Sequence, residues 1–239
     1  MSKPTVYELP AKAPKPPPLR VVAIGDLGEV TVSPVRLVVE LIIPRGMVTL
    51  FGGHGGSGKS MLALTLIAHV ACGVPWNRLP CVQGRVLYVS LEDPADVVRW
   101  RLRTICSAYG LDMSIVATNV TILDGTESEE AALMREIRMD GVTAAIETEA
   151  LSQIAQLADG ASLIVIDNAS DAADFDENNR RFVRTFIRRL GRIGRAVDAG
   201  VLLLAHIDKN AAKFGAQGNS YSGSTAWHNS VRSRLALIE

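Results

Sequence analysis

Short apolar runs alternate with amphipathic segments along most of this chain. The apolar runs are rich in Val, Ile and Leu and are bounded by polar or turn-forming residues, which is typical of buried strands. They predict strands over residues 47–51, 85–91, 119–123, 161–167, 201–206 and 231–238. The segments between them are apolar or repeat apolar residues at helical spacing, and they predict helices over residues 61–68, 94–109, 148–158 and 176–199.

Strands that alternate with helices in this way predict an α/β fold, in which a mostly parallel sheet is covered by helices on both faces. Residues 1–20 differ, because they hold six prolines and predict a disordered tail ahead of a domain over residues 21–239. Residues 21–46 predict edge strands and a turn. Residues 125–147 have no clear periodicity and receive no assignment.

The charge balance excludes a uniformly basic nucleic-acid-binding protein. The chain has 25 basic and 25 acidic residues, and residues 1–20 hold four of the basic residues and one of the acidic ones. The rest of the chain therefore carries a net charge of about −3. Any contact with DNA or RNA needs a local basic patch.

No apolar run approaches the roughly 20 residues needed to span a bilayer, and no secretory signal is recognisable. We therefore expect a cytoplasmic protein that makes no membrane contact. Cys72, Cys81 and Cys106 lack the spacing of metal ligands, so reduced and buried thiols are expected.

A glycine-rich loop lies between the first predicted strand and helix and fits the pattern G-x-x-x-x-G-K-[ST]. Its residues are Gly53, His54, Gly55, Gly56, Ser57, Gly58, Lys59 and Ser60. Glycines let the backbone curl so that N–H groups point at phosphate oxygens, and a helix N-terminus favours an anion. Lys59 can reach the β- and γ-phosphates, and the Ser60 hydroxyl can ligate Mg²⁺. The loop, with Met61 after it, predicts a nucleotide site; the alternative is a Gly-rich turn that binds no phosphate.

Polar residues follow three further strands, at the carboxyl ends where ligands bind in open α/β sheets. Asp167 ends an apolar run and would orient Mg²⁺, unless it only caps the next loop. Glu92 can orient and deprotonate the attacking water, because Asp93 is expected to cap the helix that follows. His206 could hydrogen-bond the γ-phosphate or the water, or simply end its strand. His54 and His69 are expected to be structural.

Arginines near the C-terminus offer positive charge. Arg232 could stabilise the γ-phosphate, from a neighbouring subunit; Arg234 competes for this role, and a surface ion pair is the alternative. The helix over 176–199 carries seven arginines between residues 180 and 195 and no acid. Five of them form a stripe at helical spacing: Arg181, Arg184, Arg188, Arg192 and Arg195. The stripe fits a solvated face, a subunit interface or a nucleic-acid contact.

Taken in order, the motifs resemble the RepA-type branch of the RecA-like ATPases, found in plasmids and phages. The resemblance covers about residues 40–238 and rests on Gly52 to Ser60, Leu91-Glu92-Asp93-Pro94, Val165-Ile166-Asp167-Asn168, Asp176-Glu177-Asn178-Asn179, Ala205-His206-Ile207-Asp208-Lys209 and Ser222-Gly223-Ser224. It implies a RecA-like P-loop NTPase core, hydrolysis of ATP with Mg²⁺, a homo-oligomeric ring, typically a hexamer, and a DNA-linked role. By motif position, Glu92 matches the catalytic glutamate, Asp167 the Walker B aspartate, His206 the phosphate sensor and Arg232 the arginine finger.

Three features depart from this pattern. Residues 169–177 are acidic where helicase relatives can carry arginines, and Ser222 stands where relatives often have Arg. The chain also ends just after residues 235–238, where relatives continue with further strands, so we expect a truncated or naturally short form.

Two functions remain open. The first is a replicative helicase, in which ATP hydrolysis moves the loop over 210–224 along single-stranded DNA through Lys209, Lys213, Phe214 and Tyr221. The second is a nucleotide-switched assembly, loader or recombination-accessory ATPase that does not unwind DNA. A small-molecule kinase is less favoured, because no acceptor pocket is evident.

Overall fold

A computed structural model describes residues 25, 35–206 and 225–237. The chain divides into a unit that ends at Pro34 and a second unit that begins at Val35. The tail expected over 1–20 and the loop expected over 210–224 lie outside the described residues. Every helix and strand of the described residues lies in the second unit.

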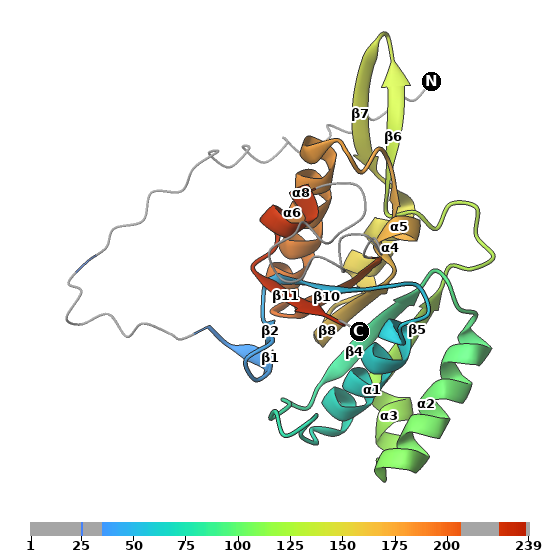
Figure 1. The fold of residues 1–239 in the computed structure, drawn as a ribbon, viewed down its shortest axis with the longest axis vertical. Coiled ribbons are helices and arrows are strands. Elements are labelled where there is room, and N and C mark those ends of the chain that lie inside the picture. Colours follow the sequence, from blue (N-terminus) through green and yellow to red (C-terminus); the bar gives the residue numbers. More distant parts are fainter. Residues whose placement is uncertain (1–24, 26–34, 207–224, 238–239) are drawn as a thin grey trace, which may run out of the picture. The chain divides into compact units, whose positions relative to one another are not determined.

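A six-stranded sheet forms the centre of this unit, in the order β11-β3-β10-β8-β4-β5, and all neighbouring strands run parallel (Figure 1). The strands are β3 Val48–Gly53, β4 Arg85–Ser90, β5 Val120–Asp124, β8 Ala161–Asp167, β10 Gly200–His206 and β11 Ser233–Ala236. Each lies within two residues of a predicted strand at both ends. The predicted α/β class and parallel sheet are confirmed.

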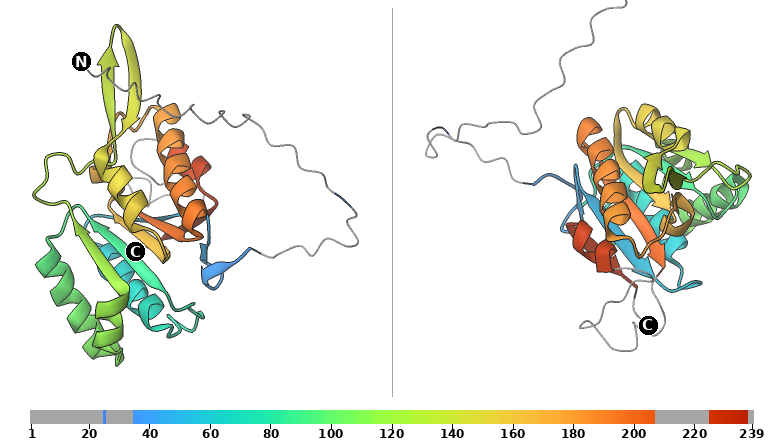
Figure 2. Two further views of the ribbon diagram at one scale, coloured as in Figure 1. Left: turned by 180° about the vertical axis from the view of Figure 1, so that it is seen from behind. Right: turned by 90° about the horizontal axis from the view of Figure 1, so that it is seen from above.

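Helices cover both faces of the sheet, because successive side chains of a strand point to opposite faces. Val86 and Tyr88 of β4 pack with α1 (Lys59–Cys72), α2 (Ala95–Tyr109) and α3 (Met113–Asn119). Leu87 and Val89 of the same strand pack with α4 (Glu149–Leu157) and α6 (Arg180–Val197). Figure 2 shows the two helix layers on either side of the sheet.

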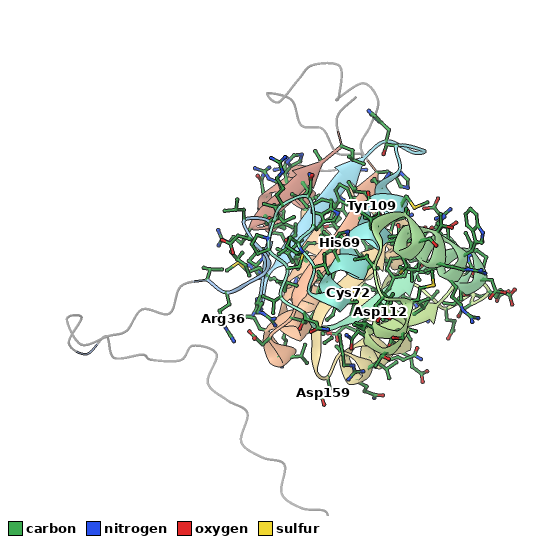
Figure 3. All side chains as sticks on the ribbon, turned by 90° about the horizontal axis from the view of Figure 1, so that it is seen from below. Arg36, His69, Cys72, Tyr109, Asp112 and Asp159 are labelled. Atoms are coloured by element: carbon green, nitrogen blue, oxygen red, sulfur yellow. The ribbon has the colours of Figure 1, made fainter. Side chains whose placement is uncertain are left out.

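Polar contacts also join the helices of the first layer (Figure 3). The ring of His69 on α1 meets the edge of Tyr109 on α2, with centroids 5.2 Å apart. The Cys72 thiol donates to the Asp112 carbonyl oxygen at 3.8 Å, and the Asp112 carboxylate caps α3. His69 is therefore structural, as expected. All three cysteines carry free thiols, and Cys106 is buried.

The segment 125–147, left unassigned above, contains a hairpin of β6 (Met134–Met139) and β7 (Val142–Glu147). Its two-residue turn is Asp140-Gly141, and both residues have positive φ, 50° and 77°. An Asp-Gly pair is a strong signal for such a turn, so the hairpin was predictable. Figure 1 shows it standing away from the six-stranded sheet.

Short elements complete the unit. The predicted edge strands and turn correspond to β1 (Leu37–Val39) and β2 (Ile43–Pro44), which pair antiparallel. The helix expected over 176–199 begins only at Arg180. Three short elements were not predicted: α5 (Ala169–Ala172), β9 (Ala173–Asp174) and α8 (Thr225–Ser230). Within the described residues, no helix has both the length and the apolarity required to cross a bilayer.

The aromatic contacts of α6 generate a stability prediction. Phe186 is fully buried and meets Phe175 and Trp227 edge to face, at 5.9 Å and 6.0 Å between ring centroids. We expect Phe186→Ala to lower the free energy of unfolding by about 3–5 kcal/mol, because it leaves a cavity that neighbours cannot fill. Urea denaturation measures this. Trp100→Ala is the control, since Trp100 is 64% exposed; equal losses in both variants would contradict the assigned core.

Candidate nucleotide and magnesium site

The register of the sheet brings the predicted site residues to one edge. Strand β10 lies between β3 and β8, and His206 pairs with Gly53. On the other side of β8, Ser90 pairs with Asp167. The loop after β3, the carboxyl ends of β8 and β10, and Glu92 just after β4 therefore share the carboxyl edge of the sheet. Four separate stretches of sequence contribute to one site.

Glycine is required at several positions of the loop. Gly56 and Gly58 have φ of 77° and 88°, which side-chain-bearing residues rarely adopt. A Cβ on Gly53 would lie 2.8 Å from Ser57 Oγ and 2.9 Å from Lys59 Cγ. No side chain caps the N-terminus of α1, where Gly58 is the N-cap residue. The curled backbone and this uncapped helix start form a suitable cradle for phosphate.

Lys59 is buried and hydrogen-bonded at this edge. Its Nζ donates to the carbonyl oxygens of Gly53 and His54, at 2.9 Å and 2.8 Å, and lies 3.4 Å from His206 Nδ1. An ammonium group has donors only, so His206 Nδ1 accepts and its Nε2 carries the hydrogen. Burial lowers the pKa of Lys59, and the negative charges of Asp167 and Glu92 oppose that shift.

Asp167 supplies a buried carboxylate beside the loop. The Tyr88 hydroxyl donates to its Oδ2 at 2.7 Å. Burial raises the pKa of Asp167, and the hydroxyl groups of Tyr88 and Ser60 oppose the rise. The pKa of Tyr88 is raised far above its usual range, by burial and then by Asp167.

The Ser60 hydroxyl and the Asp167 carboxylate fit Mg²⁺ bound together with a nucleotide. Both groups are oxygen ligands, and Mg²⁺ in such sites is held by one or two protein oxygens plus phosphates and waters. Ser60 lies near enough to Asp167 to lower the pKa of its carboxyl, so the two side chains can share an ion. The fit rests on this donor set and on the cradle beside it.

Glu92 is exposed, and it is oriented by a residue that the sequence did not single out. Asn168 Nδ2 donates to Glu92 Oε2 at 3.0 Å. The other amide atom of Asn168, Oδ1, accepts from the backbone N–H groups of Ser170 and Asp171 and caps α5. A carboxylate that is exposed and yet held in position suits a general base acting on water.

The predicted helix cap at Asp93 is wrong. Asp93 instead forms a two-point ion pair with Arg101, two turns into α2. The backbone N–H of Ala95 donates to Asp124 Oδ2 at 2.6 Å, so the cap comes from the end of β5. A cap supplied by a distant strand depends on strand order, which local sequence does not encode.

Arg232 lies far from the site of its own chain. Strand β11 begins with Ser233 paired to Thr49, near the amino end of β3. Arg232 comes before Ser233, so it lies one residue further than Thr49 from the carboxyl edge of the sheet. At about 3.3 Å per residue along a strand, its distance from Gly53 is roughly 16 Å. Arg234 is also exposed, and its Nη1 donates to His228 Nδ1 at 2.6 Å. The structure thus unites Lys59, Ser60, Asp167, Glu92 and His206 but separates both arginines from them.

Three residues near the site were missed. Tyr88 carries a hydroxyl within the apolar run Val86 to Val89, and Asn168 directly follows Asp167; these were the available signals. Glu177 is half-buried near Trp227, Ser170 and His206. Burial raises its pKa. Only the folded arrangement connects these residues.

A protein-family model described as an AAA domain matches residues 12–212 of the chain. The chain belongs to this family of P-loop ATPases. The match includes the glycine-rich loop, Glu92, Asp167 and His206, so the AAA domain contains every residue assembled at the carboxyl edge of the sheet.

The raised pKa of Asp167 predicts how stability depends on pH. At pH values between 3.8, the ordinary pKa of an aspartate, and the raised pKa of Asp167, the folded protein keeps a proton that the unfolded chain has lost. The free energy of unfolding therefore falls as pH rises through that interval, and Asp167→Asn removes this fall. Urea denaturation of both proteins at several pH values between about 4 and about 7 tests this. Asp96→Asn is the exposed control, and a stability gain from Asp167→Asn that does not grow with pH would contradict the prediction.

Proposed function

We propose that this AAA-domain protein hydrolyses ATP with Mg²⁺ at the carboxyl edge of its sheet. The observation that carries the proposal is the convergence of Lys59, Asp167 and Glu92, each beside the phosphate cradle and each with a distinct partner. Gly53 to Ser60 and Met61 would surround the phosphates. Ser60 and Asp167 would hold the metal ion.

Each residue of the site has a separate role in the proposed hydrolysis. Glu92 takes a proton from the water that attacks the γ-phosphorus, and Asn168 keeps the carboxylate aimed at it. Lys59 turns from the loop carbonyls to the β- and γ-phosphates and offsets their charge. His206, with its Nε2–H, donates to the γ-phosphate or to the water. Bound Mg²⁺ supplies further neutralisation of phosphate charge.

The oligomer and the DNA dependence extend the proposal. We place the protein in the RepA-like branch, as a ring, typically a hexamer, that acts on single-stranded DNA in phage or plasmid replication. The position of Arg232 is consistent with this assembly, because it is exposed near the opposite edge of the sheet, where it would act on the nucleotide of a neighbouring copy. The loop over 210–224 would contact the DNA.

A second candidate function is favoured by the segment after β8. Asp171, Asp174 and Asp176 are all exposed there, which is unfavourable for contact with DNA phosphates. This charge suits an assembly, loader or recombination-accessory ATPase that does not unwind DNA. ATP turnover without strand displacement would favour this candidate over the helicase.

Replacing Glu92 tests the central assignment. We expect Glu92→Gln to lower ATP turnover by about 10²–10⁴-fold, because glutamine cannot take the proton from water, while nucleotide binding persists. Steady-state hydrolysis is measured without DNA, with single-stranded DNA and with duplex DNA. Asp96→Asn serves again as the control, and stimulation by single strands is the result expected for a DNA motor. Near-normal turnover in Glu92→Gln would refute its role as base.

Mixing two inactive variants tests the role of Arg232 in a neighbouring site. Arg232→Ala and Glu92→Gln should each be nearly inactive alone. Mixed equally, they should recover about one quarter of wild-type turnover, because sites that join an intact Glu92 to an intact Arg232 form at random across a head-to-tail interface. A mixture no more active than its components would exclude a shared site.

A further inference from the structure

A groove with a strongly positive lining runs along α6 at the edge of the sheet opposite the nucleotide site. It lies between α6 and the segment that joins α8 to β11, and it encloses about 410 Å³. Buried Val48 and Ile187 form part of its floor. Its exposed side chains are all arginine or asparagine: Arg184, Arg188, Arg195, Asn229 and Arg232.

Three arginines of α6 line this groove. At about 100° per residue, Arg184, Arg188 and Arg195 project within roughly 40° of one another. Arg181 does not line the groove, and Arg192 lines a separate cavity beside α4. The five arginines predicted to form one stripe therefore do not share one surface. Only three of them line the groove.

The positive charge of the groove is not balanced within the described residues. No carboxylate lines it, and the one ion pair found for α6 in the described part of the chain joins Arg189 to Glu147 outside the groove. Arg195 Nη1 donates to the Gly46 carbonyl oxygen, which fixes this side chain along the groove. Ser230 Oγ is buried and has no hydrogen-bond partner among the described residues. The groove thus presents donors to an external anion.

The linear layout of these donors indicates the form of the anion. From Arg184 to Arg195 the helix rises about 16 Å, at 1.5 Å per residue, which exceeds the reach of one phosphate group. Guanidinium groups bind phosphate through two hydrogen bonds, so a row of them suits a chain of phosphates. A protein partner would instead need exposed apolar anchors, which this lining lacks.

We infer that this groove binds the sugar–phosphate backbone of single-stranded nucleic acid. The inference rests on the proposed DNA-dependent function and adds a second contact surface to it. The contact is assigned to Arg184, Arg188 and Arg195 of α6, since Arg232 is proposed to act in a neighbouring site. Asn229 to Arg232 belong to the groove and follow closely in sequence after the predicted DNA-contacting loop over 210–224. Because the groove contacts only the backbone, binding should not depend on base sequence.

The test compares two double variants of the full chain that lose the same charge from the same helix. Arg184→Gln with Arg188→Gln alters the groove, and Arg181→Gln with Arg192→Gln is the matched control. Binding of a fluorescently labelled oligo(dT) is followed by anisotropy at several salt concentrations. The groove variant should bind the oligonucleotide more weakly than the wild-type protein. The slope of log K against log salt concentration should be less negative by about 1.4, because two phosphate contacts are lost. The control should keep the wild-type slope.

The remaining outcomes separate the explanations. ATP turnover without DNA should stay at the wild-type level in both variants, which shows that they are folded. Equal weakening in both would overturn the inference in favour of general electrostatic attraction. Unchanged DNA binding with a lower assembly mass would assign the groove to contact between copies instead. If the wild-type protein binds no oligo(dT), both the inference and the DNA dependence fail, whereas binding that the groove variant retains overturns the inference alone.

Discussion

Lys59 and Asp167 bring opposite charges into a region from which water is nearly excluded, since the two residues are 5% and 2% exposed. Neither charge is stable there without partners, because burial disfavours the ionised form of both groups. Loop carbonyls and His206 surround the ammonium, while Tyr88 hydrogen-bonds the carboxylate and Ser60 helps to lower its pKa. These partners come from α1, β4 and β10 and from the loop, so the whole carboxyl edge must be assembled before either charge is tolerated.

Much of this arrangement could be predicted from the sequence, for an identifiable reason. The four central strands, β3, β10, β8 and β4, are buried along nearly their whole length, and a strand buried on both faces leaves little choice of where it begins and ends. The predicted ligands directly follow such strands or lie in a loop with a distinctive glycine pattern. Their meeting at one edge then follows from parallel pairing alone. Lys59, Ser60, Asp167, Glu92 and His206 could be brought together on these grounds.

The features that the sequence did not reveal depend on contacts between distant segments. Asp93 has the chemistry of a helix cap, but Arg101 binds it and Asp124 takes over the cap. Nothing near Tyr88 in sequence indicates that its hydroxyl reaches Asp167, which is 79 residues away. The division of the arginine stripe also required the packing of α6, because helical spacing alone does not show which neighbouring element lies beside each residue.

The hydrogen bonds of Lys59 have a consequence for ligand choice. Two carbonyl oxygens of its own loop already occupy the ammonium group, so the loop and an incoming nucleotide compete for the same donor. A ligand displaces the loop only if it offers at least as many well-placed oxygens, and a single phosphate offers fewer than a β–γ pair. For the proposed nucleotide, this competition favours a ligand with both a β- and a γ-phosphate over one with a single phosphate.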